Sequence, residues 1–201
     1  MEEEINRPTG QKKHKVFDVI ISVILVILIV ILSSFLLLRI VYKDYQVAQR
    51  SMTPTLSNGD YILVNKRQKA KRGDVIVVNR EGADPIIKRL MAIGGDELKI
   101  DKDGNVWVKY GAEGEFVLQD EPYVVYPMEE KEERVWTIPS GMIFVLGDNR
   151  AESSDSRSFG CLKYKDVVGV VPKWVIKNKD TKRYEIFFNL FTFGYLKKIF
   201  K

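Results

Sequence analysis

The strongest constraint on the fold of this chain is an uninterrupted apolar run near its N-terminus. Residues 19–38 read VIISVILVILIVILSSFLLL and contain no charged residue. A helix of about 20 apolar residues is just long enough to cross a hydrocarbon core about 30 Å thick. A cleaved signal peptide has a shorter apolar stretch and a small-x-small site, whereas the nearest match here ends at Ala48 with Gln46 where a small residue is needed. The run therefore predicts a retained membrane-spanning helix, with a buried soluble helix and a cleaved signal as the alternatives.

Basic residues flank this run on both sides, slightly more densely before it. The N-terminal flank carries Arg7, Lys12, Lys13 and Lys15, and the C-terminal flank carries Arg39, Lys43 and Arg50. Because basic residues favour the cytoplasmic side, this asymmetry predicts a cytoplasmic N-terminus. We expect three parts: a cytoplasmic segment over residues 1–15, a single-pass anchor over 16–40 and an extracytoplasmic domain over 41–201.

The residues after the anchor read as short strands separated by turns. Candidate strands rich in Val, Ile, Tyr and Trp occupy residues 61–65, 74–78, 86–93, 98–100, 106–109, 116–118, 123–126, 134–138, 142–146 and 167–171. Only one short helix is expected, over residues 164–168. The aromatic tail, residues 184–201, predicts an element that lies on a surface or forms an edge strand. The expected fold class is mostly β: one membrane helix followed by an all-β sandwich or barrel.

The composition excludes several kinds of chemistry. The net charge is +5, but the charges are scattered and do not form the basic stripe of a nucleic-acid binder. With one His (His14) and one Cys (Cys161), the chain has no internal disulfide and no zinc site of the usual His and Cys kind. His14 precedes the apolar run, so the expected domain has no histidine to act as a catalytic base. We predict no metal and no cofactor.

Three segments stand out from the β background. The first is SMTPTL at residues 51–56, in which Ser51 on its own is most simply a turn hydroxyl. The second is PIIKRLMAIGGD at residues 85–96, where strand alternation places Lys88 on the same face as Ile86, Leu90 and Ala92. The ammonium either reaches water at a sheet edge or is a general base whose pKa is lowered by burial. The third, GDNRAESSDSRSFG at residues 147–160, predicts a polar loop at a strand end.

In this order and behind an N-terminal anchor, the three segments resemble the bacterial type I signal peptidases, and the compact Gram-positive members most of all. The resemblance implies a Ser/Lys endopeptidase of the plasma membrane that binds extended signal peptides of exported pre-proteins next to membrane lipid and cleaves them after a small-x-small motif. It also implies a set of roles: Ser51 as nucleophile, Lys88 as general base, Ser153 as the hydroxyl that orients Lys88, Asp155 and Arg157 as a bracing pair, Gly147, Asp148, Asn149 and Arg150 as a structural loop, and Met52, Leu56 and Ile87 near the substrate pocket.

The chemistry of these residues agrees with the roles. Without a histidine, a lysine is the remaining sensible base for a serine, provided that the site lowers its pKa to roughly 7 or 8. A carboxylate close to the lysine would raise that pKa, so we expect Asp155 to face Arg157. The N–H of Ser51 is the natural first oxyanion donor.

The sequence departs from the family pattern before the nucleophile. Many members have a small hydroxyl residue two positions earlier as a second oxyanion donor, and this chain has Gln49 there. Either the Gln49 amide donates in its place or the backbone acts alone.

Two rival functions remain. The self-cleaving repressor-type Ser/Lys proteases are cytosolic and have no anchor. A membrane-tethered, non-catalytic peptide-binding β domain is the alternative that is not an enzyme.

Overall fold

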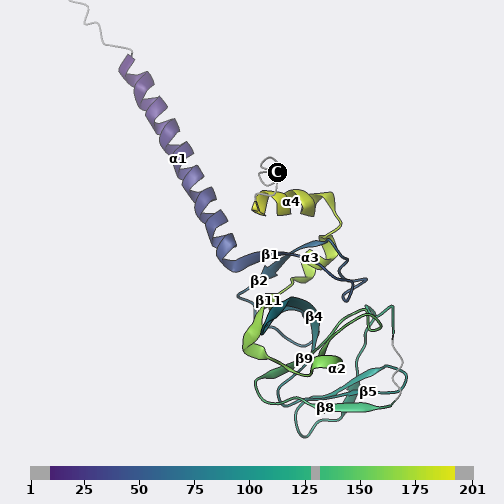
Figure 1. Ribbon diagram of the computed structural model, residues 1–201. Coiled ribbons are helices and arrows are strands. Elements are labelled where there is room, and N and C mark those ends of the chain that lie inside the picture. Colours follow the sequence, from purple (N-terminus) through teal and green to yellow (C-terminus); the bar gives the residue numbers. More distant parts are fainter. Residues whose placement is uncertain (1–9, 128–131, 193–201) are drawn as a thin grey trace, which may run out of the picture. The chain divides into compact units, whose positions relative to one another are not determined.

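A computed structural model describes residues 10–127 and 132–192. The chain divides into two compact units, with the boundary between Ile40 and Val41. The described part of the first unit belongs to helix α1 (Gly10–Val41) (Figure 1), which contains the apolar run 19–38 and whose last residue lies at the boundary. Its segment Lys15–Val41 has a mean hydropathy of 3.3 and is long and apolar enough to cross a membrane. The side chains of this segment are exposed on all sides, which suits lipid better than water.

The second unit is built mainly from two antiparallel sheets. The larger sheet has seven strands in the order β1-β2-β11-β3-β4-β9-β10. Its strands are β1 (Tyr42–Gln46), β2 (Tyr61–Asn65), β3 (Val75–Arg80), β4 (Ala83–Ile93), β9 (Met142–Leu146), β10 (Leu162–Lys163) and β11 (Val167–Val170). The mostly β fold predicted from the sequence is confirmed.

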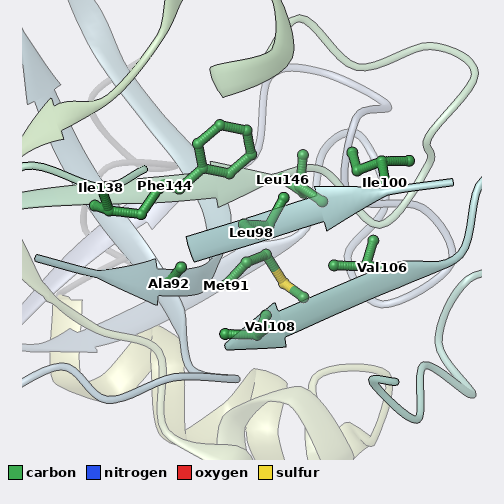
Figure 2. Packing of buried hydrophobic residues seen from close by; sticks show 9 residues of the cluster. All are labelled: Met91, Ala92, Leu98, Ile100, Val106, Val108, Ile138, Phe144 and Leu146. Atoms are coloured by element: carbon green, nitrogen blue, oxygen red, sulfur yellow. The ribbon is translucent and has the colours of Figure 1, made fainter. Parts of the chain in front are cut away.

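The smaller sheet has the order β7-β6-β5-β8. Its strands are β5 (Glu97–Ile100), β6 (Val106–Lys109), β7 (Phe116–Leu118) and β8 (Arg134–Thr137). Figure 2 shows side chains of this sheet, such as Leu98 and Val108, meeting Phe144 and Leu146 of β9 and Met91 of β4 in one buried cluster. This cluster joins the two sheets.

Strand β9 is buried on both faces, since Phe144 and Leu146 enter that cluster while Ile143 and Val145 enter a second one. Strand β4 changes face part of the way along. Its register with β9 shifts between Leu90 and Ala92, so Leu90 packs in the second cluster and Ala92 in the first. The expected single face of residues 86, 88, 90 and 92 was therefore wrong at Ala92, because a bulge breaks the period of two.

Three short helical elements and one longer helix complete the described part of the second unit. They are α2 (Ser156–Phe159), the 3₁₀ turn η1 (Tyr164–Asp166), α3 (Lys173–Asn178) and α4 (Lys182–Thr192). Helix α4 packs its residues 184, 188 and 192 inward, and the ring of Phe188 lies 5.1 Å from that of Tyr61 on β2. The tail was expected as a surface element or edge strand. The described part of it is a helix, and residues 193–201 lie outside the described residues.

Several local predictions were wrong. The strand expected at residues 123–126 is irregular apart from an isolated bridge from Tyr126 to Asn149. Strand β1 was missed, because YKDYQ has no apolar alternation of its own and becomes a strand by pairing with β2. The helix expected at 164–168 is only the η1 turn, after which the chain enters β11.

Candidate active site

Ser51 and Lys88 meet in the second unit although 37 residues separate them in sequence. Lys88 Nζ lies 2.5 Å from Ser51 Oγ, within hydrogen-bond distance. Ser51 sits in a tight turn, in which the N–H of Thr53 donates to the carbonyl of Arg50. Lys88 comes from the middle of β4, directly opposite Ile76 of β3. A turn and a strand thus place a hydroxyl and an amine side by side.

Burial changes the acid–base behaviour of Lys88. Only 2% of its surface is exposed, and desolvation lowers the pKa of its ammonium to about 8. The carboxylate of Asp155 opposes this shift, and the charges of Arg157 and Arg80 add to it. With a pKa of about 8, about one lysine in ten is neutral at pH 7, compared with about one in 2,500 at the ordinary value. Lys88 is therefore able to accept a proton near neutral pH.

Asp155 faces Arg157 and not Lys88. Arg157 Nε donates to Asp155 Oδ1 at 2.9 Å and its Nη2 donates to Oδ2 at 3.0 Å. Burial would raise the pKa of the Asp155 carboxyl, but hydrogen bonds and the charge of Arg157 hold it below its ordinary value. The positive charge of Arg157 offsets the negative charge of the Asp155 carboxylate, which would otherwise stabilise the Lys88 ammonium more strongly.

Ser153 does not make the contact that the family resemblance implies. Its Oγ is buried and has no hydrogen-bond partner in the part of the chain that the structure describes. The proposed orienting role of Ser153 toward Lys88 stays a prediction.

The loop after β9 holds the backbone of Ser51. The N–H of Asn149 donates to the carbonyl of Ser51 at 3.1 Å, and Asn149 Nδ2 donates to the carbonyl of Arg50 at 3.4 Å. A Cβ at Gly147 would overlap Ser153 Oγ and come within 2.5 Å of the Ser51 carbonyl oxygen. Glycine at position 147 therefore lets the loop approach the turn that carries Ser51.

Two buried ion pairs fix this loop, and the sequence analysis missed a partner in each. Asp148 is fully buried and accepts from Arg89 Nε at 2.8 Å and Nη2 at 2.6 Å, as well as from Thr55 Oγ1. Arg150 donates to both carboxylate oxygens of Glu121. A signal was available for Arg89, because it follows Lys88 on a strand and so points to the opposite face. No comparable signal exists for Glu121, which comes from a distant loop.

A cavity of about 320 Å³ opens beside Ser51. It lies between the segment from Tyr45 to Gln49 and the hairpin of β3 and β4. Its lining residues are Tyr45, Gln46, Val47, Ala48, Gln49, Ser51, Met52, Arg80, Ala83, Asp84, Pro85, Ile86 and Ile87. Met52, Ile87 and Gln49 thus reach the cavity, as the resemblance implies for the first two. Leu56 is fully buried and does not line it. Arg80 and Asp84 are charged lining residues that the sequence analysis did not single out.

No group of three or more His, Cys, Asp and Glu side chains within residues 10–127 and 132–192 is placed to hold a metal ion. The chemistry available at this site is that of a hydroxyl, an amine of lowered pKa and backbone donors.

Comparison with known proteins points to one family. Residues 20–175 match the family described as signal peptidase, peptidase S26. Signal peptidase I U of Bacillus subtilis (strain 168) is 32% identical over 179 residues, which cover 80% of this chain and 88% of that protein. Signal peptidase IB of Staphylococcus aureus (strain COL) is 29% identical over 180 residues, which cover 79% of this chain and 88% of that protein.

A solved structure is also similar. It is a crystal structure of a signal peptidase I from Enterococcus faecalis V583, with 28% sequence identity and a TM-score of 0.44. The match covers 52% of this chain and 98% of that one.

Proposed function

Because this chain belongs to the signal peptidase family, peptidase S26, we propose that it is a membrane-bound serine endopeptidase that cleaves signal peptides from exported pre-proteins with a Ser51/Lys88 dyad. The 2.5 Å approach of Lys88 Nζ to Ser51 Oγ in a buried setting is the observation that carries this proposal. It favours an enzyme over a peptide-binding domain, because a buried lysine aimed at a serine is costly unless it is used.

In the first step the neutral amine of Lys88 takes the hydroxyl proton of Ser51 while Ser51 Oγ attacks the scissile carbonyl carbon. The electron pair of the C=O bond moves to oxygen, and the Ser51 N–H donates a hydrogen bond to the oxyanion. When the intermediate collapses, the C–N bond breaks and the Lys88 ammonium gives its proton to the leaving amine. The products are an acyl-enzyme and the new N-terminus of the mature protein.

In the second step the amine product has left, and a water molecule attacks the acyl-enzyme. Lys88 is neutral again and takes a proton from the attacking water, whose oxygen adds to the ester carbonyl. Collapse of this intermediate breaks the C–Oγ bond, and the ammonium returns the proton to Ser51. Asp155 stabilises the ammonium formed in both steps without quenching the base, since Arg157 holds its carboxylate.

The cavity beside Ser51 suits an extended peptide with small side chains. In the described chain β9 pairs with residues 89–93 of β4, so the edge of residues 83–87 that is not paired with β3 is available for backbone hydrogen bonds from a peptide. Met52, Ile86 and Ile87 supply apolar lining near Ser51. The opening of about 320 Å³ has room for small side chains of an extended peptide on both sides of Ser51.

Helix α1 is proposed as the anchor, with residues 1–15 in the cytoplasm and residues 41–201 on the outer side of the plasma membrane. The support is the apolar segment Lys15–Val41 and the slight excess of basic residues on its N-terminal flank.

The proposal is tested by cleavage of a pre-protein with Ala at the first and third positions before the cleavage site, using purified full-length enzyme in detergent. We expect a single cut after the small-x-small motif and no cut when either Ala is replaced by Phe. The mature N-terminus is read by mass spectrometry. Equal cutting of the Ala and Phe substrates would contradict the proposed specificity.

The pH dependence reports on Lys88. Because only the neutral amine acts as base, kcat/KM should rise about tenfold per pH unit below an apparent pKa near 8 and level off above it. The measurement is the initial rate at substrate concentrations well below KM between pH 6 and 10, with circular dichroism as a check on folding at each pH. A profile that is flat over this range, or that rises only near the ordinary lysine pKa of about 10.4, would exclude Lys88 as the base.

Gln49 is exposed and lines the cavity together with Ser51. If its side-chain amide is the second oxyanion donor, Gln49→Ala should lower kcat by roughly 10² to 10³ with little change in KM, because the contact exists mainly in the transition state. Gln49→Ser should retain more activity than Gln49→Ala, since a hydroxyl is also a donor. Steady-state kinetics decide between the two explanations: an Ala variant within about threefold of wild type means that the backbone donor acts alone.

A further inference from the structure

A second cavity adjoins the turn that carries Ser51. Its volume is about 550 Å³, compared with about 320 Å³ for the first cavity, which Ser51 itself lines. Arg50 and Thr53 line the second cavity, whereas Gln49, Ser51 and Met52 line the first. The turn is therefore a wall that both cavities share, with the nucleophile at their common border.

The two cavities differ in chemistry. The first has the apolar side chains of Met52, Ile86 and Ile87, which suit small residues before the scissile bond. A bound pre-protein continues far beyond that bond, so the start of the mature protein has to pass over the turn and leave the first cavity. The start of a mature protein is an exposed chain terminus, which suits a polar surface. The lining of the second cavity is mainly polar and includes Arg50, Thr53, Tyr126, Asn149, Ala151 and Glu152.

Arg50 has an unused charge at the second cavity. Its backbone is fixed, because its carbonyl accepts from the N–H of Thr53 and from Asn149 Nδ2. Its side chain is exposed, and its guanidinium has no hydrogen bond or ion pair with the residues that the structure describes. Glu152, the other charged lining residue, is held by Asn149, whose Nδ2 donates to Glu152 Oε2 at 3.4 Å. The guanidinium is thus the group that is ready to take a ligand.

We propose that the second cavity binds the segment just after the scissile bond, and that Arg50 selects an acidic side chain among the first three residues of the mature protein. A guanidinium presents a planar set of donors that matches both oxygens of a carboxylate. Three extended residues span about 10 Å, so one of their side chains passes within reach of the residue next to the nucleophile. The inference rests on the proposed cleavage of pre-proteins by Ser51 and Lys88.

The test compares pre-proteins that differ only after the cleavage site. Asp, Gln or Lys is placed at the first, second or third position of the mature part, one at a time. Purified full-length enzyme in nonionic detergent cleaves the Asp and Lys substrates mixed in one tube, so the ratio of the two initial rates gives the ratio of their kcat/KM values. We expect Asp to be preferred over Lys by about fivefold at one or more of the three positions, with Gln in between.

Variants of Arg50 assign the preference to its charge. Arg50→Gln should abolish the preference for Asp, and Arg50→Glu should reverse it, so that the Lys substrate is cleaved faster. The matched control is Arg67→Glu, which makes the same charge change at an exposed arginine that lines neither cavity and should keep the wild-type ratio. Sodium chloride at about 1 M should bring the wild-type ratio toward one, because salt screens exposed charges.

Several outcomes would overturn the inference. One is equal cleavage of the Asp and Lys substrates by the wild type at all three positions, and another is a preference for Asp that survives in Arg50→Glu. Loss of the preference in Arg67→Glu as well would show a general effect of net charge. Each ratio compares two substrates in one enzyme, so it does not depend on the fraction of folded protein. If Arg50→Glu is inactive, the ratio for Arg50→Gln decides.

The same assay separates failure of this inference from failure of the proposed function. Cleavage of both substrates at equal rates contradicts only the selection by Arg50. A wild-type enzyme that cleaves none of the pre-proteins contradicts the proposed function and, with it, the inference that rests on it.

Discussion

Replacing either Ser51 or Lys88 by Ala is expected to lower kcat/KM for a small-x-small pre-protein by about 10⁴-fold or more, because nucleophile and base act as one unit. Lys88 Nζ and Ser51 Oγ are 2.5 Å apart, so removal of either leaves the other without its reaction partner. For the same reason the double variant should be no slower than the single ones. Purified full-length variants are compared by the rate at which the mature protein appears.

Matched controls show whether these losses are specific. Ser57→Ala and Lys163→Met change exposed residues of the same types outside the proposed dyad, and both variants should cleave at the wild-type rate. The Lys88→Ala enzyme should also retain the wild-type circular dichroism spectrum. Substantial cleavage by that variant would remove Lys88 from the mechanism.

Part of the site could be predicted from the sequence pattern. The period of two placed Lys88 next to Ile86 on one strand face. The family resemblance supplied Asp155 and Arg157 as a pair, and the expectation that Asp155 faces Arg157 agrees with their bidentate ion pair. The meeting of Ser51 with Lys88 was not visible in the same way, because it depends on how a turn and a strand 37 residues apart are brought together by the sheet. Only the likeness of three separate motifs to a known family suggested it.

The parts of the fold that were missed depend on tertiary context. Strand β1 is polar in sequence and is ordered by its pairing with β2. In α4 the aromatic residues by themselves favour a strand. The buried positions of Tyr184, Phe188 and Thr192, each four residues apart, show that this segment is a helix packed along one face. A bulge between Leu90 and Ala92 turns the Ala92 side chain to the opposite face of the sheet, and no local sequence pattern predicts this bulge.

The largest effect on stability is expected at Arg89, which the sequence analysis did not single out. Arg89→Met removes both hydrogen bonds that Arg89 donates to the fully buried carboxylate of Asp148. A buried charge that loses its partner costs about 3 to 5 kcal/mol in free energy of unfolding, and for a domain of this size that lowers Tm by roughly 10 °C. Thermal unfolding followed by circular dichroism in detergent measures the change.

The partly exposed ion pair of Lys109 with Glu97 gives the matched control, because its side chains are 21% and 31% exposed. Lys109→Met should cost less than about 1 kcal/mol. Arg89→Met combined with Asp148→Leu should recover most of the lost stability, since no unpaired charge is then buried. Activity should not recover in the same way, because Asp148 precedes Asn149, whose N–H holds the carbonyl of Ser51. Equal melting temperatures for Arg89→Met and Lys109→Met would show that the Arg89–Asp148 ion pair does not stabilise the loop at residues 147–150. That result would contradict the idea that β4 supports the Ser51 backbone through Asp148.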